Sequence, residues 1–415
     1  MVYLTSLTFW LALALLNRSL ACSYFEVNTS LPEGKIMGHT MEFDRYYNVF
    51  DSYFKVIPRG YPHRLYNDTN DTACGSQTSS QGSLGYVGIE FADLFGDGMN
   101  EEGLIIASQS LYRSQYQKCN PCSKHYKTIN IMQLPAYILS HFKNVPDLKW
   151  AIRHHKICVV NTDKEKTSNL HWAIADKKGN SIVLEYIDGE PQIHENYVGV
   201  MTNDPPYLWQ VDNLNTFAWL TADANVTSQD LRLDTGNQLP GTDAIPKNWG
   251  HGFNMGGLPA DASPPLALRA HVLYPSGVPA QLQAPGHAGI HGLGLSLDKV
   301  QGILNTIYIP KGFTGVDPSQ QVQSDHTAWA TMRVPSTGFY AFRTYANMQW
   351  HVINTKLLGW NQAATLNVSG SSILDSFKDI TGDLPQNQKT ARTNFLAPVQ
   401  RHEGDDSVFL QHEEM

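Results

Sequence analysis

A short apolar run near the N-terminus ends just before a cysteine, and this arrangement constrains the chain more than any other feature. The run from Leu7 to Leu16 is too short to span a bilayer, which takes about 20 residues, but it suits the hydrophobic region of a signal peptide. Ser19 and Ala21 supply the small residues that signal peptidase requires before Cys22. The sequence therefore predicts that residues 1–21 are a signal peptide and that the protein is secreted or lumenal.

Two other interpretations of this segment stay open. No Lys or Arg precedes the apolar run, and Arg18 follows it, so one alternative is an uncleaved anchor. The other is a bacterial lipoprotein acylated on Cys22, although Ser19 stands where such a signal usually carries Leu. No other segment has the length and apolarity to cross a membrane. Secretion is also favoured by N-x-S/T glycosylation acceptors at Asn28, Asn67, Asn70, Asn225 and Asn367.

Cleavage after Ala21 would change the chemistry of Cys22. A free α-amino group titrates at about pH 7.7–8.0, so part of it is unprotonated at neutral pH. It is tethered to the thiol of the same residue, which would then supply both a nucleophile and its general base. The alternative is that the cleavage site happens to precede an ordinary cysteine.

The chain has five cysteines, so a secreted form leaves one of them over after pairing. Cys119 and Cys122 have a spacing that also occurs in metal and redox sites, but no second Cys or His pair follows at zinc-ligand spacing. His287 and His291 lie among Gly and Pro, which predicts a loop, and His154-His155 is interpreted as a solvated helix end. We expect no metal ion and no cofactor.

The composition indicates a globular protein and argues against a nucleic-acid-binding one. Hydrophobic residues make up 42% of the chain, which is enough for a sizeable core. The formal net charge of −8 argues against a nucleic-acid partner, because binding to phosphates needs a clustered basic excess. The sequence leaves the oligomeric state open, including a homo-oligomer.

The order of predicted elements is strands, then helices, then strands, which favours an α+β layered fold. Ser23–Val27 and Gly34–Phe43 predict an N-terminal hairpin that buries Cys22 at a strand end. Asp97–Gly103 has the composition of a turn. Asn144 is an N-cap candidate for a helix that ends at Arg153. Other strands are expected over 85–91, 103–110, 170–175, 181–186, 327–334, 338–343 and 349–354, and other helices over 134–142 and 297–305.

Several short motifs together resemble those of the choloylglycine hydrolases, a family within the N-terminal-nucleophile hydrolases that includes bile salt hydrolases and penicillin V acylases. Their order and spacing carry more weight than any single match. They are Cys22-Ser-Tyr-Phe25, Gly38-His-Thr-Met-Glu-Phe43, Asp97-Gly-Met-Asn-Glu-Glu-Gly-Leu104, Asn169-Leu-His-Trp172, Met201-Thr-Asn-Asp-Pro205, Trp209-Gln-Val-Asp-Asn-Leu-Asn215, Gly256-Gly-Leu-Pro-Ala-Asp261 and Phe342-Arg-Thr-Tyr345.

The resemblance implies an αββα four-layer sandwich over residues 22–370, followed by a polar tail over 371–415. It also implies hydrolysis of a linear amide C–N bond in a small N-acyl conjugate. Cys22 would be the nucleophile and, through its amine, the base. Asn203 would donate its side-chain amide to the oxyanion, and Glu42 would orient the α-amine.

Three positions depart from the family pattern and put the substrate in doubt. His39 replaces an arginine beside the nucleophile. A cationic imidazole would favour the thiolate and a neutral one would not, so activity is expected to depend on pH below about 7. Ser110 stands where the family has Asn or Tyr in the substrate pocket. Arg269 is the one arginine left in the stretch where the family carries a pair. Tyr207, in an aromatic stretch, is predicted to line the substrate pocket, although core packing explains that pattern as well.

Two further functions stay open beside the amidase. One is a fatty-acyl amide hydrolase related to the acid amidases, which share the N-terminal cysteine. The other is a secreted binding protein that keeps the fold but has lost catalysis. If the amidase prediction holds, Cys22 is the cysteine left over. Cys74, Cys119, Cys122 and Cys158 would then form two disulfides, in one of three connectivities.

Overall fold

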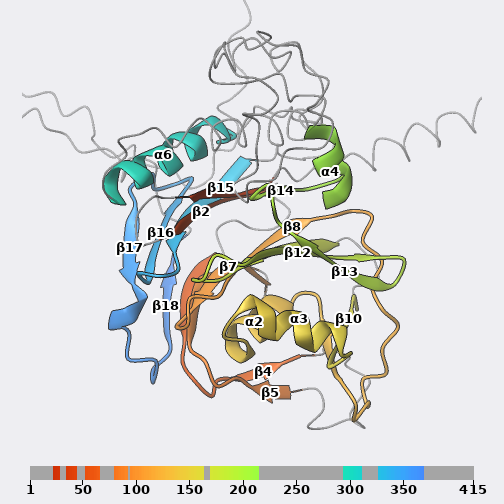
Figure 1. The fold of residues 1–415 in the computed structure, drawn as a ribbon. Helices are drawn as coiled ribbons and strands as arrows, with labels where there is room; N and C mark the ends of the chain where they lie inside the picture. Colours follow the sequence, from red (N-terminus) through yellow and green to blue (C-terminus); the bar gives the residue numbers. More distant parts are fainter. Residues whose placement is uncertain are drawn as a thin grey trace, which may run out of the picture.

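The computed structural model describes residues 22–28, 34–43, 52–65, 79–91, 94–162, 169–214, 293–310 and 326–368. These residues form four layers (Figure 1). Helix α6 (Leu293–Thr306) covers the outer face of a first sheet, and helices α2 (Leu134–His141) and α3 (Val145–Arg153) cover the outer face of a second. The two sheets pack against each other in the middle, so the expected αββα sandwich is confirmed.

The first sheet has six strands in the order β14-β1-β2-β15-β16-β17, and all neighbours in it are antiparallel. The predicted N-terminal hairpin forms, with Ser23 opposite Thr40. The strands are β1 (Ser23–Asn28), β2 (Lys35–Phe43), β14 (Val200–Thr202), β15 (His326–Val334), β16 (Phe339–Thr344) and β17 (His351–Asn354).

The second sheet has eight strands in the order β13-β12-β11-β8-β7-β6-β3-β18, again antiparallel throughout. Two small sheets add the antiparallel pair β4–β5 and the parallel pair β9–β10. The strands are β3 (Tyr53–Ile57), β4 (Pro62–Arg64), β5 (Ser79–Gln81), β6 (Tyr86–Phe91), β7 (Leu94–Asn100), β8 (Ile105–Ser110), β9 (Lys127–Asn130), β10 (Ile157–Val160), β11 (Leu170–Ala175), β12 (Ser181–Ile187), β13 (Glu190–Glu195) and β18 (Ala364–Asn367).

Strand alternation divides the core into layers, because successive side chains point to opposite faces of a sheet. On β1, Phe25 and Val27 pack under α6 against Val300 and Leu304. The intervening Cys22 and Tyr24 face the second sheet and pack in one cluster with residues such as Val87, Ala107 and Ala173. The outer face of that second sheet packs under α2 and α3. Cys22 therefore lies between the two sheets.

The helices largely follow their sequence signals. The Asn144 side chain accepts a hydrogen bond from the Asp147 N–H at 2.9 Å, so it caps α3 as predicted. His154 and His155 are exposed at the end of that helix, in agreement with their interpretation as a solvated end. Helix α6 begins before the predicted Leu297, at Leu293. A final short helix, α4 (Tyr207–Leu214), follows β14, and a 3-10 turn, η7 (Thr355–Leu357), follows β17.

One predicted turn is a strand. Residues 94–100 form β7, paired on both sides, and only residues after Asn100 turn back. The glycines that suggest a turn serve close packing instead. Gly88 and Gly98 lie opposite each other, and a Cβ on Gly98 would come within 2.5 Å of the Leu139 side chain of α2. Helix α2 can approach the sheet because Gly98 carries no side chain, while Gly88 lets β6 and β7 lie close together.

The cysteines divide as expected in the part that the structure describes. Cys119 and Cys158 form a disulfide that ties the loop before β9 to β10. Cys122 is also disulfide-bonded. Cys22 is buried and keeps a thiol outside any disulfide.

Several sequence predictions lie outside the described residues. They concern the signal peptide over 1–21, the tail over 371–415, Arg269, His287, His291, and the glycosylation acceptors Asn67, Asn70 and Asn225. Asn367 is described and is exposed on β18. Within the described ranges, no helix combines the length and apolarity needed to cross a bilayer.

Replacement of Gly88 by Ala tests the close packing of β6 and β7. A Cβ there would lie 2.3 Å from the Asp97 carbonyl oxygen, which is backbone and cannot move aside, so we expect a loss of about 1–3 kcal/mol in unfolding free energy. Gly302→Ala is the matched control, because a Cβ on that helical glycine meets nothing within 4 Å. The control should gain about 0.5–1 kcal/mol. Urea unfolding of both variants measures the difference, and equal stabilities would contradict this account.

Candidate active site

The Cys22 thiol lies between the sheets, just before β1. The residue is 1% exposed, and its Sγ lies 3.4 Å from Met41 Sδ and 3.5 Å from the Glu42 carbonyl oxygen on the adjacent strand. Local sequence explains the position: the β1–β2 hairpin aligns the residue before Ser23 with Met41. Cys22 therefore lies at the start of β1, which is flanked by β14 and β2, and next to the loop that follows β14.

Asn203 is brought next to Cys22 by the pairing of β1 with β14. Ser23 lies opposite Thr202, so the ladder places Cys22 and Asn203 at the same level, and the Thr202 hydroxyl donates to the Cys22 carbonyl at 3.0 Å. Asn203 Oδ1 accepts a hydrogen bond from the Ser110 N–H at 3.1 Å. This contact identifies the amide oxygen and leaves Nδ2 as the donor.

Asn203 Nδ2 is buried, and the described part of the chain offers it no hydrogen-bond partner. A buried donor without a partner costs about 1–3 kcal/mol, so such groups are uncommon outside sites that bind a ligand. The geometry is that of a preorganised donor for an oxyanion: one end of the amide is held by the backbone and the other is available.

Ser110 and Asp204 hold this part of the site together. The Ser110 hydroxyl donates to the Asn169 carbonyl at 3.4 Å, while its N–H orients Asn203. The Asp204 carboxylate accepts a hydrogen bond from the Tyr112 N–H, and the Asp204-Pro205 peptide is cis. The contribution of Asp204 is visible only in the structure. Binding of substrate by the Ser110 side chain remains a prediction.

His39 is close to the site but is held by Asp97. It is fully buried on the inner face of β2, and its Nδ1 lies 3.1 Å from Asp97 Oδ2. Burial lowers the pKa of His39, with the Arg333 guanidinium acting in the same direction, and Asp97 offsets this only in part. The sequence left a cationic and a neutral imidazole open; the lowered pKa favours the neutral form, whose Nδ1 donates to Asp97.

Asp97 is the hub of a buried network that the sequence did not reveal. Burial by itself raises the pKa of a carboxyl group, but the hydrogen bond from His39 and the positive charge of Arg333 more than offset this, so the pKa of Asp97 is lowered. The ionised carboxylate also accepts hydrogen bonds from side chains of β15 and β16, namely Trp329 at 3.2 Å, Thr331 at 3.1 Å and Tyr340.

The Glu42 carboxylate lies on the other face of β2 from Met41 and His39. Its two oxygens accept hydrogen bonds from the hydroxyls of Thr40 at 3.1 Å and Thr327 at 2.8 Å. It is fully buried. Glu42 directly follows Met41, the residue that lies opposite Cys22 in the hairpin. Its predicted role, orientation of the Cys22 α-amine, stays a prediction.

Tyr207 is placed in the core. It is 4% exposed, its hydroxyl donates to Asn196 Oδ1 at 3.0 Å, and its ring stacks on His194 with centroids 5.6 Å apart. The placement fits the core interpretation of this aromatic stretch, and direct contact with a substrate stays a prediction. Arg343 also turns away from Cys22: it donates to Asn305 of α6 at 2.7 Å and lies over the Trp350 ring.

Another buried carboxylate, Glu185, lies on the inner face of the eight-stranded sheet. Its Oε1 accepts hydrogen bonds from His171 Nδ1 at 3.0 Å and from the Tyr207 N–H at 2.8 Å. Burial raises the pKa of Glu185, but the hydrogen bonds from His171 and His194 more than compensate and bring it to about 2. Across the described ranges, no group of three His, Cys, Asp or Glu residues is arranged to hold a metal ion.

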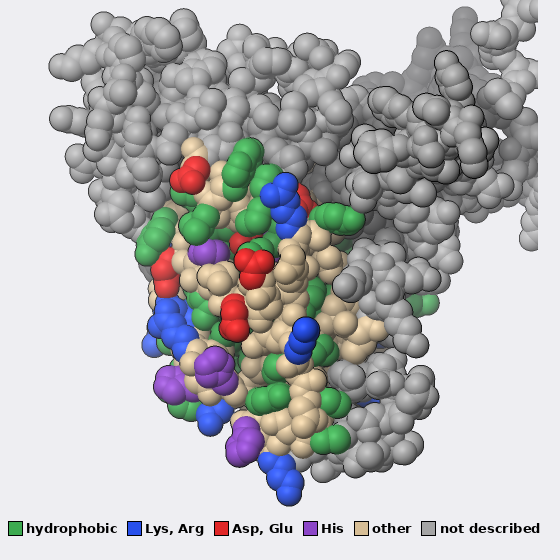
Figure 2. Space-filling model, turned by 90° about the vertical axis from the view of Figure 1, so that its right-hand side faces the viewer, with side chains coloured by type: hydrophobic (Ala, Val, Ile, Leu, Met, Phe, Trp, Pro, Cys, Tyr) green, Lys and Arg blue, Asp and Glu red, His purple; other side chains and the backbone are tan. Residues whose placement is uncertain are grey.

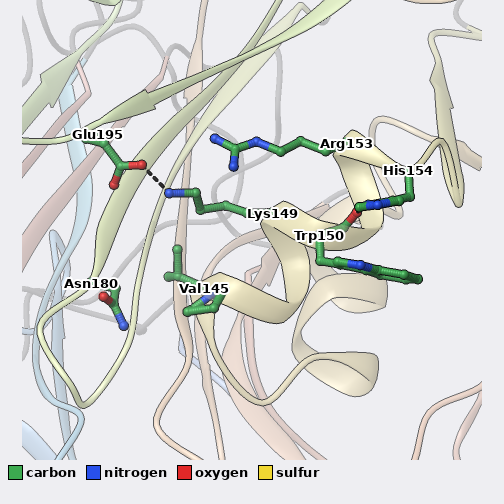
Figure 3. Close-up of a pocket in the computed structure, with 8 residues that line it drawn as sticks. Val145, Lys149, Trp150, Arg153, His154, Asn180 and Glu195 are labelled. Carbon is green, nitrogen blue, oxygen red and sulfur yellow. Dashed lines mark hydrogen bonds and ion pairs between the residues drawn. The ribbon is translucent and has the colours of Figure 1, made fainter.

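A groove of about 320 Å³ lies on the outer surface, between α3 and the end of β13. Lys149 pairs there with Glu195, while Trp150 stacks on His154 and Arg153 extends from the same helix (Figure 3). The groove is separated from Cys22 by the eight-stranded sheet, so it belongs to a different face of the molecule. Figure 2 shows basic, acidic and hydrophobic side chains interspersed over the face that lies on the right of Figure 1.

The fold and the site together define a class. Two antiparallel sheets packed between helical layers, with a buried cysteine at the start of a central strand, are the architecture of the N-terminal-nucleophile hydrolases. A family model described as linear amide C–N hydrolases, choloylglycine hydrolase family, matches residues 22–365. The chain belongs to this family, as the motifs indicated.

Relatives of known name agree with this assignment. The chain is 27% identical to the bile salt hydrolase/transferase of Clostridium perfringens over 326 residues, 76% of this chain and 88% of the relative. It is 33% identical to the penicillin V acylase of Pectobacterium atrosepticum over 135 residues, 31% of this chain and 35% of the relative.

Solved structures show the same fold. A variant of the conjugated bile acid hydrolase from Clostridium perfringens superposes with a TM-score of 0.57 at 22% identity, covering 83% of this chain and 96% of that one. Penicillin V acylase from Agrobacterium tumefaciens gives 0.56 at 19% identity, covering 86% and 97%.

The state of His39 predicts the pH dependence of activity. A neutral His39 gives no rise in kcat/KM as the pH falls from 8 to 6; protonation of the α-amine, with a usual pKa of about 7.7–8.0, lowers kcat/KM instead. His39→Asn keeps a donor to Asp97 and should retain the same profile. A rise on acidification that is present in the wild type and absent in the variant would contradict a neutral His39.

Asn203→Asp tests the oxyanion donor while preserving shape. The acceptor for the Ser110 N–H remains, but a carboxylate oxygen replaces the Nδ2 donor, so kcat should fall by about 10²–10³ or more. Asn361→Asp, the same change at an exposed position, is the control and should leave kcat unaltered. Steady-state hydrolysis of an N-acyl amide measures both, and a wild-type kcat for Asn203→Asp would rule out this role.

Proposed function

We propose that the mature protein is a secreted amidase that hydrolyses small N-acyl conjugates, with Cys22 as its nucleophile. The observation that carries the proposal is the pairing of β1 with β14, which sets a buried thiol beside an amide N–H that lacks a partner within the described residues. The family match begins at Cys22, the residue that cleavage after Ala21 would expose.

In the proposed reaction, the α-amine of Cys22 takes the thiol proton and the thiolate attacks the substrate carbonyl carbon. The carbonyl oxygen becomes an oxyanion and accepts a hydrogen bond from Asn203 Nδ2. Collapse of this intermediate breaks the C–N bond, and the leaving amine takes the proton held by the α-ammonium. Water then attacks the thioester, with the α-amine again as base, and releases the carboxylic acid and the thiol.

The free α-amine is essential to this scheme. In the uncleaved chain the Cys22 nitrogen is a peptide amide, which cannot act as a base, so the precursor should be inactive. Signal peptidase would then activate the enzyme as it is secreted, without self-cleavage. Cys22 is already buried between the sheets, so the removal of residues 1–21 needs no rearrangement of β1.

The choice of substrate class rests on the relatives, whose names specify bile salts and penicillin V. The family description, linear amide C–N hydrolases, supports an amide that joins an acyl group to an amine. The apolar residues around Cys22, among them Met41 and Phe342, suit an acyl group with little charge.

The test begins with the mature N-terminus. Full-length protein is expressed in a secreting host, and mass spectrometry of the secreted chain should show Cys22 as its first residue. Wild type and Cys22→Ala are then assayed on N-acyl amides of glycine, taurine and ethanolamine and on phenylacetyl-type amides. We expect turnover of at least one by the wild type and none by the variant. The mechanism would be refuted by a mature chain that starts at another residue, or by a Cys22→Ala variant as active as the wild type. If neither protein hydrolyses any amide of the panel, a binding protein would be favoured.

A further inference from the structure

Two buried polar side chains beside the proposed site have hydrogen-bonding atoms that the mechanism does not use. Gln109 is 1% exposed, and neither its Oε1 nor its Nε2 has a partner in the part of the chain that the structure describes. His171 is fully buried, and its Nε2 is likewise without a partner there. Because buried amides are almost always hydrogen-bonded, an amide with both ends unsatisfied within the described residues is available to bind a ligand.

The strand register places these two side chains together. Gln109 on β8 lies opposite His171 on β11, and both point to the inner face, like Ala107 and Ala173 on the same strands. Directly opposed residues on antiparallel strands have Cβ atoms about 4.5–5.5 Å apart. The two side chains therefore form one polar patch on an otherwise apolar surface.

Two contacts place this patch next to Asn203. Ser110, which follows Gln109, donates its N–H to Asn203 Oδ1. Glu185, which bonds His171, accepts the Tyr207 N–H, four residues beyond Asn203. The ladder between β1 and β14 then connects Asn203 to Cys22. Consider a substrate whose carbonyl oxygen accepts a hydrogen bond from Asn203 Nδ2. Its atoms that lie a few bonds from that carbonyl would then be within reach of Gln109.

The chemistry of the patch selects its ligand. The Gln109 amide offers both a donor and an acceptor. Glu185 Oε1 lies 3.0 Å from His171 Nδ1, which leaves Nε2 as the ring atom without a partner in the described residues. An anionic group would only accept hydrogen bonds and would be repelled by Glu185. A hydroxyl group donates one hydrogen bond and accepts another, which matches the patch.

We infer that Gln109 and His171 form a subsite that binds a hydroxyl group of the substrate near the scissile amide, and that Gln109 determines this specificity. The inference rests on the proposed amidase function. The hydroxyl belongs either to the acyl group or to the leaving amine, and matched substrates distinguish the two sources.

The experiment compares substrates that differ by one hydroxyl. One pair is an N-acyl ethanolamide and the corresponding N-acyl ethylamide; the other is a 3-hydroxyacyl ethylamide and its deoxy counterpart. The wild type should prefer the hydroxylated member of one pair by about 10- to 100-fold in kcat/KM. In Gln109→Met, which keeps the length of the side chain, this preference should fall to about 1, with the deoxy substrate hydrolysed at least as well as by the wild type.

Gln117→Met is the matched control. The Gln117 amide accepts a hydrogen bond from the Val159 N–H at 3.0 Å, next to β10 and away from Cys22. Its replacement should lower the melting temperature and leave the hydroxyl preference intact. Gln109→Met should instead raise the melting temperature by about 2–4 °C, because it removes two buried polar atoms without partners.

Binding to the inactive Cys22→Ala variant separates this inference from the proposed function. The hydroxylated member of the preferred pair should bind at least about 10-fold more tightly than its deoxy counterpart, a difference that is lost in Cys22→Ala/Gln109→Met. If no amide is turned over but this discrimination persists, the amidase proposal fails and the subsite stands. Turnover without hydroxyl preference in either pair, or a melting temperature that falls in Gln109→Met, overturns the subsite and leaves the amidase proposal intact.

Discussion

The interaction on which the rest of the structure depends is the buried carboxylate of Asp97. It belongs to the eight-stranded sheet and accepts hydrogen bonds from His39, Trp329, Thr331 and Tyr340, which belong to three strands of the six-stranded sheet. Apolar packing between sheets is non-directional and tolerates sliding, whereas hydrogen bonds to one ionised group do not. The network therefore determines how the two sheets lie relative to each other.

The same network explains the state of His39. An ionised Asp97 needs donors, and a neutral imidazole with its proton on Nδ1 is one of them. The arginine that the family carries at this position would bring a permanent charge to the neighbourhood of the nucleophile. In this chain His39 stands at that position and bonds Asp97, so in the proposed mechanism the α-amine is the group that activates the thiol. The departure at His39 thus alters the electrostatics of the site without disturbing the placement of its nucleophile.

The proposed active site is built at the edge where strand ladders meet loops. The β1–β14 ladder carries Cys22 and Asn203, and Ser110 at the end of β8 orients the Asn203 amide from the opposite sheet. Each group is held by backbone hydrogen bonds, which position side chains more tightly than surface loops do. The Asn203, Gln109 and His171 side chains all present buried polar atoms that lack partners within the described residues, and they do so in the same region. Their convergence supports the proposed binding site.

The sequence by itself determined most of the local elements and the family, and it singled out Cys22 as the candidate nucleophile. Strand and turn signals predicted the hairpin of β1 and β2, and Asn144 predicted the start of α3. Cleavage before Cys22 stays a prediction from the small residues Ser19 and Ala21. Such signals are local, because capping and strand periodicity depend on neighbours within a few residues.

Only the tertiary structure decided which distant groups meet. The composition of residues 97–103 predicts that Asp97 belongs to a turn. Its hydrogen-bond partners Trp329 and Tyr340 lie 232 and 243 residues away. The contact between Thr202 and Cys22 spans 180 residues, and the Gln109 amide, which has no partner in the described part of the chain, has no sequence signature. Turn composition and strand composition overlap for a Gly-rich segment, and the register of remote strands depends on the summed packing of both sheets. That sum is a property of the assembled fold, which is why a single sequence could name Cys22 and Asn203 but not their surroundings.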